Sequence, residues 1–306
     1  MNMIKPIIYR YQPTSILSSN ELLNELVEYA QISPEIMKTP YFDDSFWNMG
    51  LSTITGNVRD ENQDYAFSFN LGSNQIMILA DGMGGQPYGK RASYSVVKAS
   101  AFSIVKELGK RFTFSRPDLQ EIITQAINTA SNSLSAKADK IDSYNKGLRT
   151  TLIIIIADNH EYAYGYIGDG GIVLVRESTF MHLLNPHKAN KYIPNLLSAS
   201  LGPTIHGEMT VSSIEREKHD FLIAGTDGIF DRLEASPDDF PQGTNNFLIL
   251  LMIRVSESNG NLNQLTVDII NELADFKDDQ GYLCNDNLTL GLLGNFKIPE
   301  IIHKKV

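Results

Sequence analysis

Three aspartates stand at the boundaries of apolar or turn-flanked segments, where a folded chain can hold a side chain rigidly. Asp81 follows IMILA, Asp227 follows FLIAGT and Asp286 precedes NLTL. Carboxylates held at strand ends can face one cleft, and a hard divalent cation requires such oxygen ligands. Glycine follows the first two aspartates and lets a metal ion, water or phosphate approach the main chain. A single Asp-Gly pair is typical of a turn, but the three segments together predict a metal site.

Further motifs accompany these aspartates in a defined order along the chain. The ordered segments are Arg59 to Asp64 (RDENQD), Asp81 to Gly85 (DGMGG), Arg149 to Thr151 (RTT), Gly168 to Gly170 (GDG), Thr226 to Gly228 (TDG) and Asp286 to Thr289 (DNLT). In this order they resemble the signatures of the metal-dependent protein phosphatase 2C family, as found in bacterial Ser/Thr phosphatases. The resemblance covers about residues 51 to 293, and the ordered set is far more specific than any one motif.

The resemblance implies a site for two divalent cations, Mn²⁺ or Mg²⁺. By position, Asp81 resembles the carboxylate that bridges the two ions, and the carbonyl of Gly82 resembles a ligand of one of them. Asp227 and Asp286 resemble the remaining ligands of the other ion. Asp81 is therefore expected to be a catalytic residue as well as a metal ligand.

The same comparison implies roles around the metal site. Arg59 is similar to the catalytic arginine that holds the substrate phosphate. Gln63, Asp64 and Asp169 are similar to side chains that support the site, although the two aspartates can equally be buried structural hydrogen-bond acceptors. Arg149 stands where glycine is usual, and it is either a contact for the substrate phosphate or an exposed arginine at the start of a strand.

The implied reaction is hydrolysis of phosphoserine or phosphothreonine in a protein that a Ser/Thr kinase has phosphorylated. Two neighbouring cations lower the pKa of a shared water, and the resulting bridging hydroxide attacks phosphorus in line. The alternative is a catalytically weak module with a phosphatase fold that binds or senses a phosphoprotein. Retention of Arg59 and the three aspartates favours the enzyme.

The sequence also departs from the family pattern. Gln63 occupies a position that is often glutamate, and Gly170 replaces the usual serine. The nearest upstream candidate for the aspartate of a third, weaker metal site is Asp142, which leaves that third site in doubt. Residues 187–202 are shorter than the flap of relatives, so substrate recognition should differ.

Composition excludes several other classes of function. The 306 residues carry a formal charge of -10, which disfavours nucleic acid and anionic lipid as partners. The apolar runs 152–156 and 247–253 are too short to span a bilayer, and residues 1–12 lack the apolar core of a signal peptide. With Cys284 as the single cysteine, no intrachain disulfide can form. We therefore expect a cytoplasmic protein without a nucleic-acid or membrane partner.

The elements that must position the motifs alternate between strands and helices. β-Branched and aromatic runs predict strands at 75–80, 150–158, 161–169, 171–177, 180–185, 209–215, 221–227 and 287–293. Helical spacing of apolar residues predicts helices at about 88–110, 117–139, 243–257 and 262–276. Tight connections at 158–160 and at Gly170-Gly171 predict hairpins. We expect an α+β fold in which two antiparallel sheets pack as a sandwich with helices on both outer faces.

An amphipathic helix is predicted over residues 18–31, ahead of this body. Its apolar stripe either docks on the chain's own core or binds a partner. The expected organisation is an N-terminal extension at 1–50, a catalytic domain at 51–296 and a C-terminal tail at 297–306.

Overall fold

The computed structural model describes residues 19–30, 47–83, 88–110, 118–139, 147–177, 179–189, 196–234, 242–258, 260–278, 281–282 and 284–295. Asp142, the last two glycines of the DGMGG motif and the predicted tail at 297–306 lie outside the described residues.

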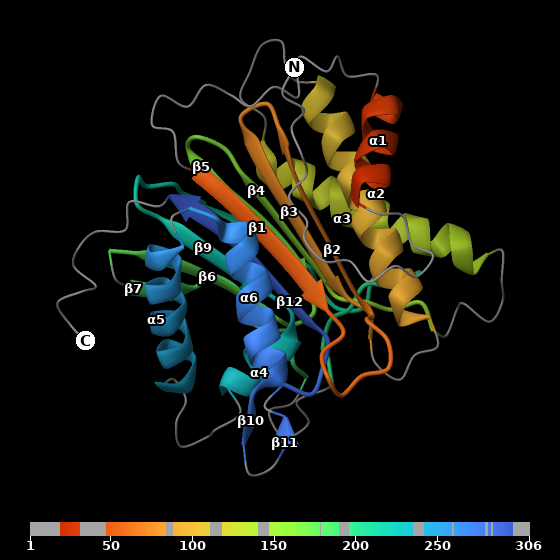
Figure 1. Ribbon diagram of the computed structural model, residues 1–306. Coiled ribbons are helices and arrows are strands. Elements are labelled where there is room, and N and C mark those ends of the chain that lie inside the picture. The colour runs from red at the N-terminus through yellow and green to blue at the C-terminus, as the bar shows by residue number, and fades with distance from the viewer. Residues whose placement is uncertain are drawn as a thin grey trace.

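Two antiparallel sheets form the centre of the molecule (Figure 1). The first has the order β1 (Trp47–Ile54), β12 (Leu288–Asn295), β9 (Phe221–Gly225), β6 (Gly171–Arg176) and β7 (Thr179–His182). The second has the order β2 (Asp64–Leu71), β3 (Asn74–Asp81), β4 (Leu152–Ala157), β5 (Glu161–Ile167) and β8 (Thr210–Glu215). A short hairpin, β10 (Lys277–Asp278) with β11 (Gly281–Tyr282), stands apart from both sheets. The predicted α+β sandwich is confirmed.

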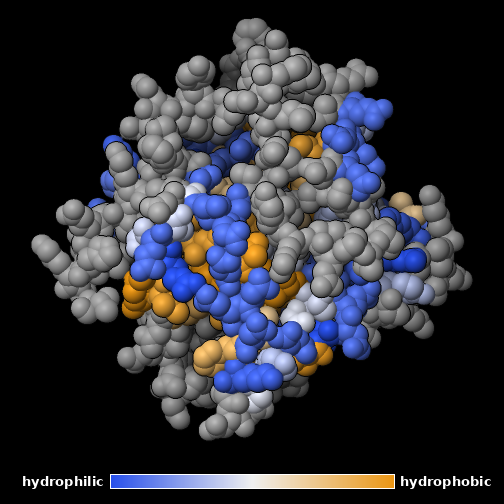
Figure 2. Space-filling model, viewed as in Figure 1, coloured by the Kyte–Doolittle hydropathy of each residue, from blue (hydrophilic) through white to orange (hydrophobic). Residues whose placement is uncertain are grey.

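Each sheet is covered on its outer face by helices. α2 (Gly89–Lys110) and α3 (Leu119–Ala138) pack on the second sheet, whereas α4 (Asp227–Glu234) and α6 (Leu262–Asp275) pack on the first, with α5 (Gln242–Glu257) alongside them. Figure 2 shows a band of hydrophilic side chains over the position of α6 in Figure 1, with hydrophobic side chains beside it. In the part of the chain that the structure describes, no helix is long and apolar enough to cross a membrane.

Strand β3 shows how the sequence builds an apolar layer on each face of the second sheet. Ile76 and Ile78 are buried in the layer between the second sheet and helices α1 to α3. Met77 and Leu79 point to the opposite face and are buried between the two sheets. Successive strand residues point to opposite faces of the sheet. A strand that is covered on both faces therefore needs a continuous run of apolar residues.

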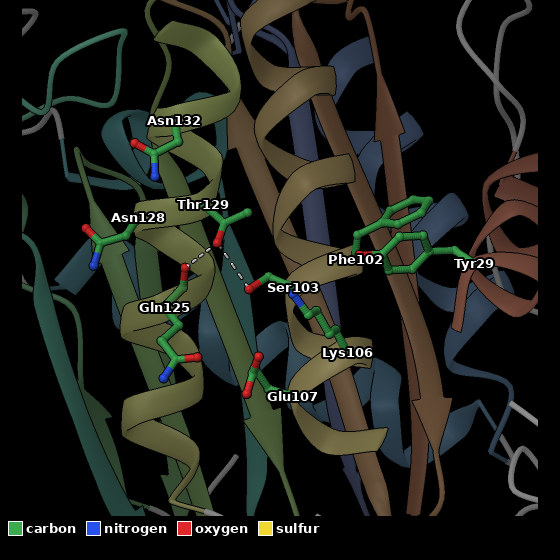
Figure 3. A pocket seen from close by; sticks show the side chains of 9 residues that line it. All are labelled: Tyr29, Phe102, Ser103, Lys106, Glu107, Gln125, Asn128, Thr129 and Asn132. Atoms are coloured by element: carbon green, nitrogen blue, oxygen red, sulfur yellow. Dashed lines mark hydrogen bonds between the residues drawn. The ribbon is translucent and has the colours of Figure 1, made fainter. Parts of the chain in front are cut away.

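Helix α1 (Ser19–Ala30) docks on the core of its own chain. Leu22 and Leu26 are fully buried in the cluster that also contains the apolar side of α2. Tyr29 makes an edge contact with Phe102 of α2, with ring centroids 4.7 Å apart. Both rings line a groove whose other walls are polar side chains of α2 and α3 (Figure 3).

Of the two alternatives for this helix, the structure shows the one in which it completes the core. The division into extension, domain and tail stays a prediction, and β1 already begins at Trp47.

The predicted hairpin at Gly170-Gly171 is wrong. β5 pairs with β4 and β8 in one sheet, whereas β6 pairs with β7 and β9 in the other, so the chain crosses between sheets at this point. Gly168 and Gly170 adopt φ angles of +105° and +103°, which side chains disfavour. A Cβ on Gly170 would lie 2.6 Å from the carbonyl oxygen of Gly225. This backbone conformation and this close contact therefore favour glycine at position 170.

Candidate metal centre

Asp81 is the last residue of β3, and its backbone is held by the segment that precedes β4. The amide of Thr151 donates to the carbonyl oxygen of Asp81 over 2.8 Å, and the hydroxyl of Thr150 donates to the same oxygen over 2.7 Å. The amide of Asp81 in turn donates to Oγ1 of Thr151 over 3.0 Å. These contacts set the direction in which the carboxylate leaves the strand.

Gly82 lies where β3 meets the start of α2, and a side chain would not fit there. A Cβ at this position would lie 2.4 Å from the carbonyl carbon of Gly89 and 2.9 Å from the carbonyl oxygen of Gln63. The amide of Gly82 donates to that same oxygen over 3.1 Å. Gln63 is fixed in turn, because its amide donates to Oδ1 of Asn287 over 2.8 Å. The glycine thus allows the metal motif and the 59–64 motif to approach each other.

Asp227 and Asp286 come together because α4 begins against the turn that precedes β12. Asp227 is the first residue of α4, directly after β9. A Cβ on Gly228 would lie 1.9 Å from the carbonyl oxygen of Asn287, so only glycine permits this approach. Asn287 holds this turn against residues 55–61, because its Nδ2 donates to the carbonyl oxygens of Thr55 and Glu61 over 2.9 and 3.0 Å.

Asp64 lies opposite Asp81 in the β2–β3 register. Its Oδ2 accepts hydrogen bonds from the hydroxyls of Thr226 and Thr289 over 2.9 and 2.6 Å. Its Oδ1 is buried and has no hydrogen-bond partner among the described residues. Burial, together with the charge of Asp286, raises the pKa of Asp64 to about 6, although its hydrogen bonds act in the opposite direction.

Asp81, the expected bridging ligand, and the neighbouring carboxylates interact electrostatically with one another. Burial raises the pKa of Asp81 well above its ordinary value, and the charges of Asp227 and Asp64 raise it further. Burial likewise raises the pKa of Asp227, with Asp169 and Asp231 as the largest charge contributions. We call the six interacting side chains the acidic cluster: Asp64, Asp81, Asp169, Asp227, Asp231 and Asp286.

Asp231 belongs to the acidic cluster, although none of the sequence motifs includes it. Carboxylate oxygens of Asp169, Asp227 and Asp231 lie within 4.8 Å of one another. The Asp227-Gly228 pair predicts a turn at the end of a strand, whereas a helix begins at Asp227 in the structure. Residues four apart share a helix face, so a helical interpretation would have placed Asp231 beside Asp227.

The two predicted arginines lie in different surroundings. Arg59 forms an ion pair with Asp286, with 2.6 Å between Nη2 and Oδ2, and its side chain is 45% exposed. Arg149 is half-buried, and its Nη1 donates to Oγ of Ser200 over 3.1 Å. Its carbonyl oxygen accepts from the amide of Met83, next to the metal motif. A substrate contact by Arg149 stays a prediction.

The donor set fits a divalent cation. Several carboxylates with raised pKa values converge, and Oδ1 of Asp64 is buried without a hydrogen-bond donor among the described residues. Carboxylate and carbonyl oxygens are the ligands that Mg²⁺ and Mn²⁺ prefer. Buried carboxylates that repel one another gain most when a cation neutralises them.

This chain is similar to known proteins in sequence and in fold. The family model described as protein phosphatase 2C matches residues 56–265. The protein phosphatase PhpP of Streptococcus pneumoniae serotype 2 is 24% identical over 250 residues, which cover 72% of this chain and 96% of that protein. The Mycobacterium tuberculosis serine/threonine phosphatase PstP/Ppp is 20% identical, with a TM-score of 0.61 over 82% of this chain and 99% of its own. A PstP catalytic domain in complex with two manganese ions is 19% identical, with a TM-score of 0.61 over 81% and 98% of the two chains.

The family match therefore agrees with the fold and with the acidic motifs that the fold brings together, and this chain belongs to the protein phosphatase 2C family.

Proposed function

We propose that this chain, a metal-dependent protein serine/threonine phosphatase, holds two Mn²⁺ or Mg²⁺ ions with Asp81, the carbonyl of Gly82, Asp227 and Asp286. The observation that carries the assignment is the convergence of carboxylates from β3, α4 and the turn before β12 on one partly buried cluster. Two bound ions would supply an acidified water and charge neutralisation for the phosphoryl group.

Asp81 is the proposed bridging ligand because its carboxylate interacts with both sides of the acidic cluster. Asp64 lies on one side, paired with it across β2 and β3, and Asp227 lies on the other. Removing the charge of Asp81 should therefore affect both ions, whereas removing that of Asp227 should affect mainly one. Asp64, Asp169 and Gln63 are proposed to support these ligands.

Arg59 is the proposed phosphate-binding residue. It is partly exposed, and it is anchored at Asp286, a proposed metal ligand. A guanidinium has several N–H donors in one plane, so one edge can bind the carboxylate while another binds phosphate oxygens. Arg149 is proposed as a further phosphate contact.

The proposed substrates are proteins phosphorylated on serine or threonine by an opposing kinase in the cytoplasm. The named relatives are protein phosphatases, which supports a phosphoprotein as the partner.

The test is hydrolysis of a phosphothreonine peptide and of p-nitrophenyl phosphate as a function of Mn²⁺. We expect Mn²⁺-dependent turnover that Asp81→Asn abolishes. Asp268→Asn is the matched control, because Asp268 is exposed on α6 and the chemical change is the same. Turnover that is insensitive to Asp81→Asn would refute the assignment, and Mn²⁺ binding without turnover would favour a phosphoprotein-binding module.

A further inference from the structure

Lys188 places a positive charge at one end of the acidic cluster. Its Nζ lies 2.5 Å from Oδ1 of Asp231, and the two side chains are 20% and 27% exposed. The charge of Lys188 also lowers the pKa of Asp169, against the effect of burial and of Asp231. One ammonium group therefore acts on two carboxylates of the cluster.

The backbone around Lys188 is ordered on both sides. Lys188 forms a β-bridge with Leu197, and the amide of Ser198 donates to the carbonyl oxygen of His187 over 2.7 Å. The imidazole of His187 accepts from the amide of Gly168 through Nδ1 over 3.1 Å. These contacts hold residues 187 and 188 against residues 197 and 198, which fixes the backbone from which the Lys188 side chain extends.

The charges of the acidic cluster balance with two divalent ions. Within the described residues, two of its six carboxylates form ion pairs with basic side chains, Asp286 with Arg59 and Asp231 with Lys188. Four negative charges are left when all the carboxylates are ionised, and two divalent ions carry four positive charges. Without Lys188 the same cluster would have a fifth uncompensated negative charge, located at Asp231.

We propose that Lys188 is a built-in counter-ion that limits this chain to two divalent cations. An ammonium group has donors and no acceptor, so it cannot share the Asp231 oxygen with a metal ion without strong repulsion. A third ion at Asp169, Asp227 and Asp231 would have to displace Lys188 into water. This inference rests on the proposed two-ion site, and it assigns to Lys188 the control of metal stoichiometry.

The experiment is isothermal titration of the full chain with MnCl₂, with free Mn²⁺ counted in parallel by electron paramagnetic resonance. We expect two ions per chain for the wild type and for Lys188→Arg, which keeps the positive charge. Lys188→Met should bind a third ion, with a Kd about tenfold or more below any residual third binding of the wild type. Adding Asp231→Asn to Lys188→Met should return the stoichiometry to two.

The outcomes separate this inference from the two-ion site. A folded Lys188→Met variant that binds Mn²⁺ like the wild type would overturn the role of Lys188, while two ions in the wild type would still support the proposed function. A third ion that persists in the double variant would also overturn it. A wild type that fails to bind two ions would refute the proposed function itself. Circular dichroism checks folding, and Lys188→Gln replaces Lys188→Met if the latter does not fold.

Discussion

Replacing Asp64 by asparagine should stabilise the metal-free protein. Oδ2 of Asp64 accepts two hydroxyl hydrogen bonds, which an amide oxygen can also accept. Oδ1 is buried, and no described group donates to it, while the neighbouring carboxyl group of Asp81 interacts with it. An amide at this place can keep the hydrogen bond with Asp81 while it removes the negative charge that repels the carboxylate of Asp81.

The size of the effect follows from the pKa. In the folded protein the pKa of Asp64 rises from 3.8 to about 6. The folded state therefore binds more protons than the unfolded state between these values, and its stability falls as pH rises through this window. The raised pKa of Asp64 then lowers the stability of the folded protein by about 3 kcal/mol at pH 7.5 and by roughly 1.5 kcal/mol at pH 5. The advantage of Asp64→Asn should grow by about 1.5 kcal/mol across that range.

Urea unfolding in EDTA, followed by circular dichroism at pH 5 and pH 7.5, measures this difference. Asp268→Asn on the exposed face of α6 is the control for the Asp-to-Asn change itself. With saturating Mn²⁺ the wild type should regain its stability relative to the variant, because the ions bind the ionised cluster. An Asp64→Asn protein that is no more stable than the wild type at pH 7.5 without metal would refute the reasoning.

Three further predictions concern the metal ligands, the N-terminal helix and the second arginine. Asp81→Asn should abolish turnover and weaken both ions, whereas Asp227→Asn should mainly weaken one, as measured by activity and Mn²⁺ titration; near-normal activity of Asp81→Asn at saturating Mn²⁺ would contradict the bridging role. Leu26→Ala should lower the free energy of unfolding by about 2–5 kcal/mol in urea denaturation, since Leu26 is fully buried, and Asn24→Ala on the exposed side of α1 should be close to neutral. Arg149→Gly should raise KM for the phosphopeptide; unchanged kinetics across a Mn²⁺ titration would leave Arg149 only its contact with Ser200.

Local sequence was sufficient for the elements and for most of the proposed ligands. Apolar alternation and length identified β3, β4 and the long helices, because these signals depend on neighbouring residues alone. The ordered motifs predicted that Asp81, Asp227 and Asp286 share one site, and the fold brings these three carboxylates close enough to interact. Each of these motifs lies at the end of an element or in a connection, where the backbone can direct a side chain towards a common cleft.

The tertiary structure decided what depends on contacts between distant segments. Gly170-Gly171 has the composition of a hairpin turn, yet β6 finds its partners in β7 and β9, and only sheet pairing determines that choice. Lys188 belongs to none of the ordered motifs. Its ammonium group contacts the carboxylate of Asp231 because the segment after β7 lies against α4. Asp231 lies beside Asp227 because a helix, rather than a turn, begins at Asp227. The sequence by itself thus determined the elements and predicted the metal ligands. Packing and register decided which charges lie near one another, because electrostatic energies depend on distances that only the folded chain sets.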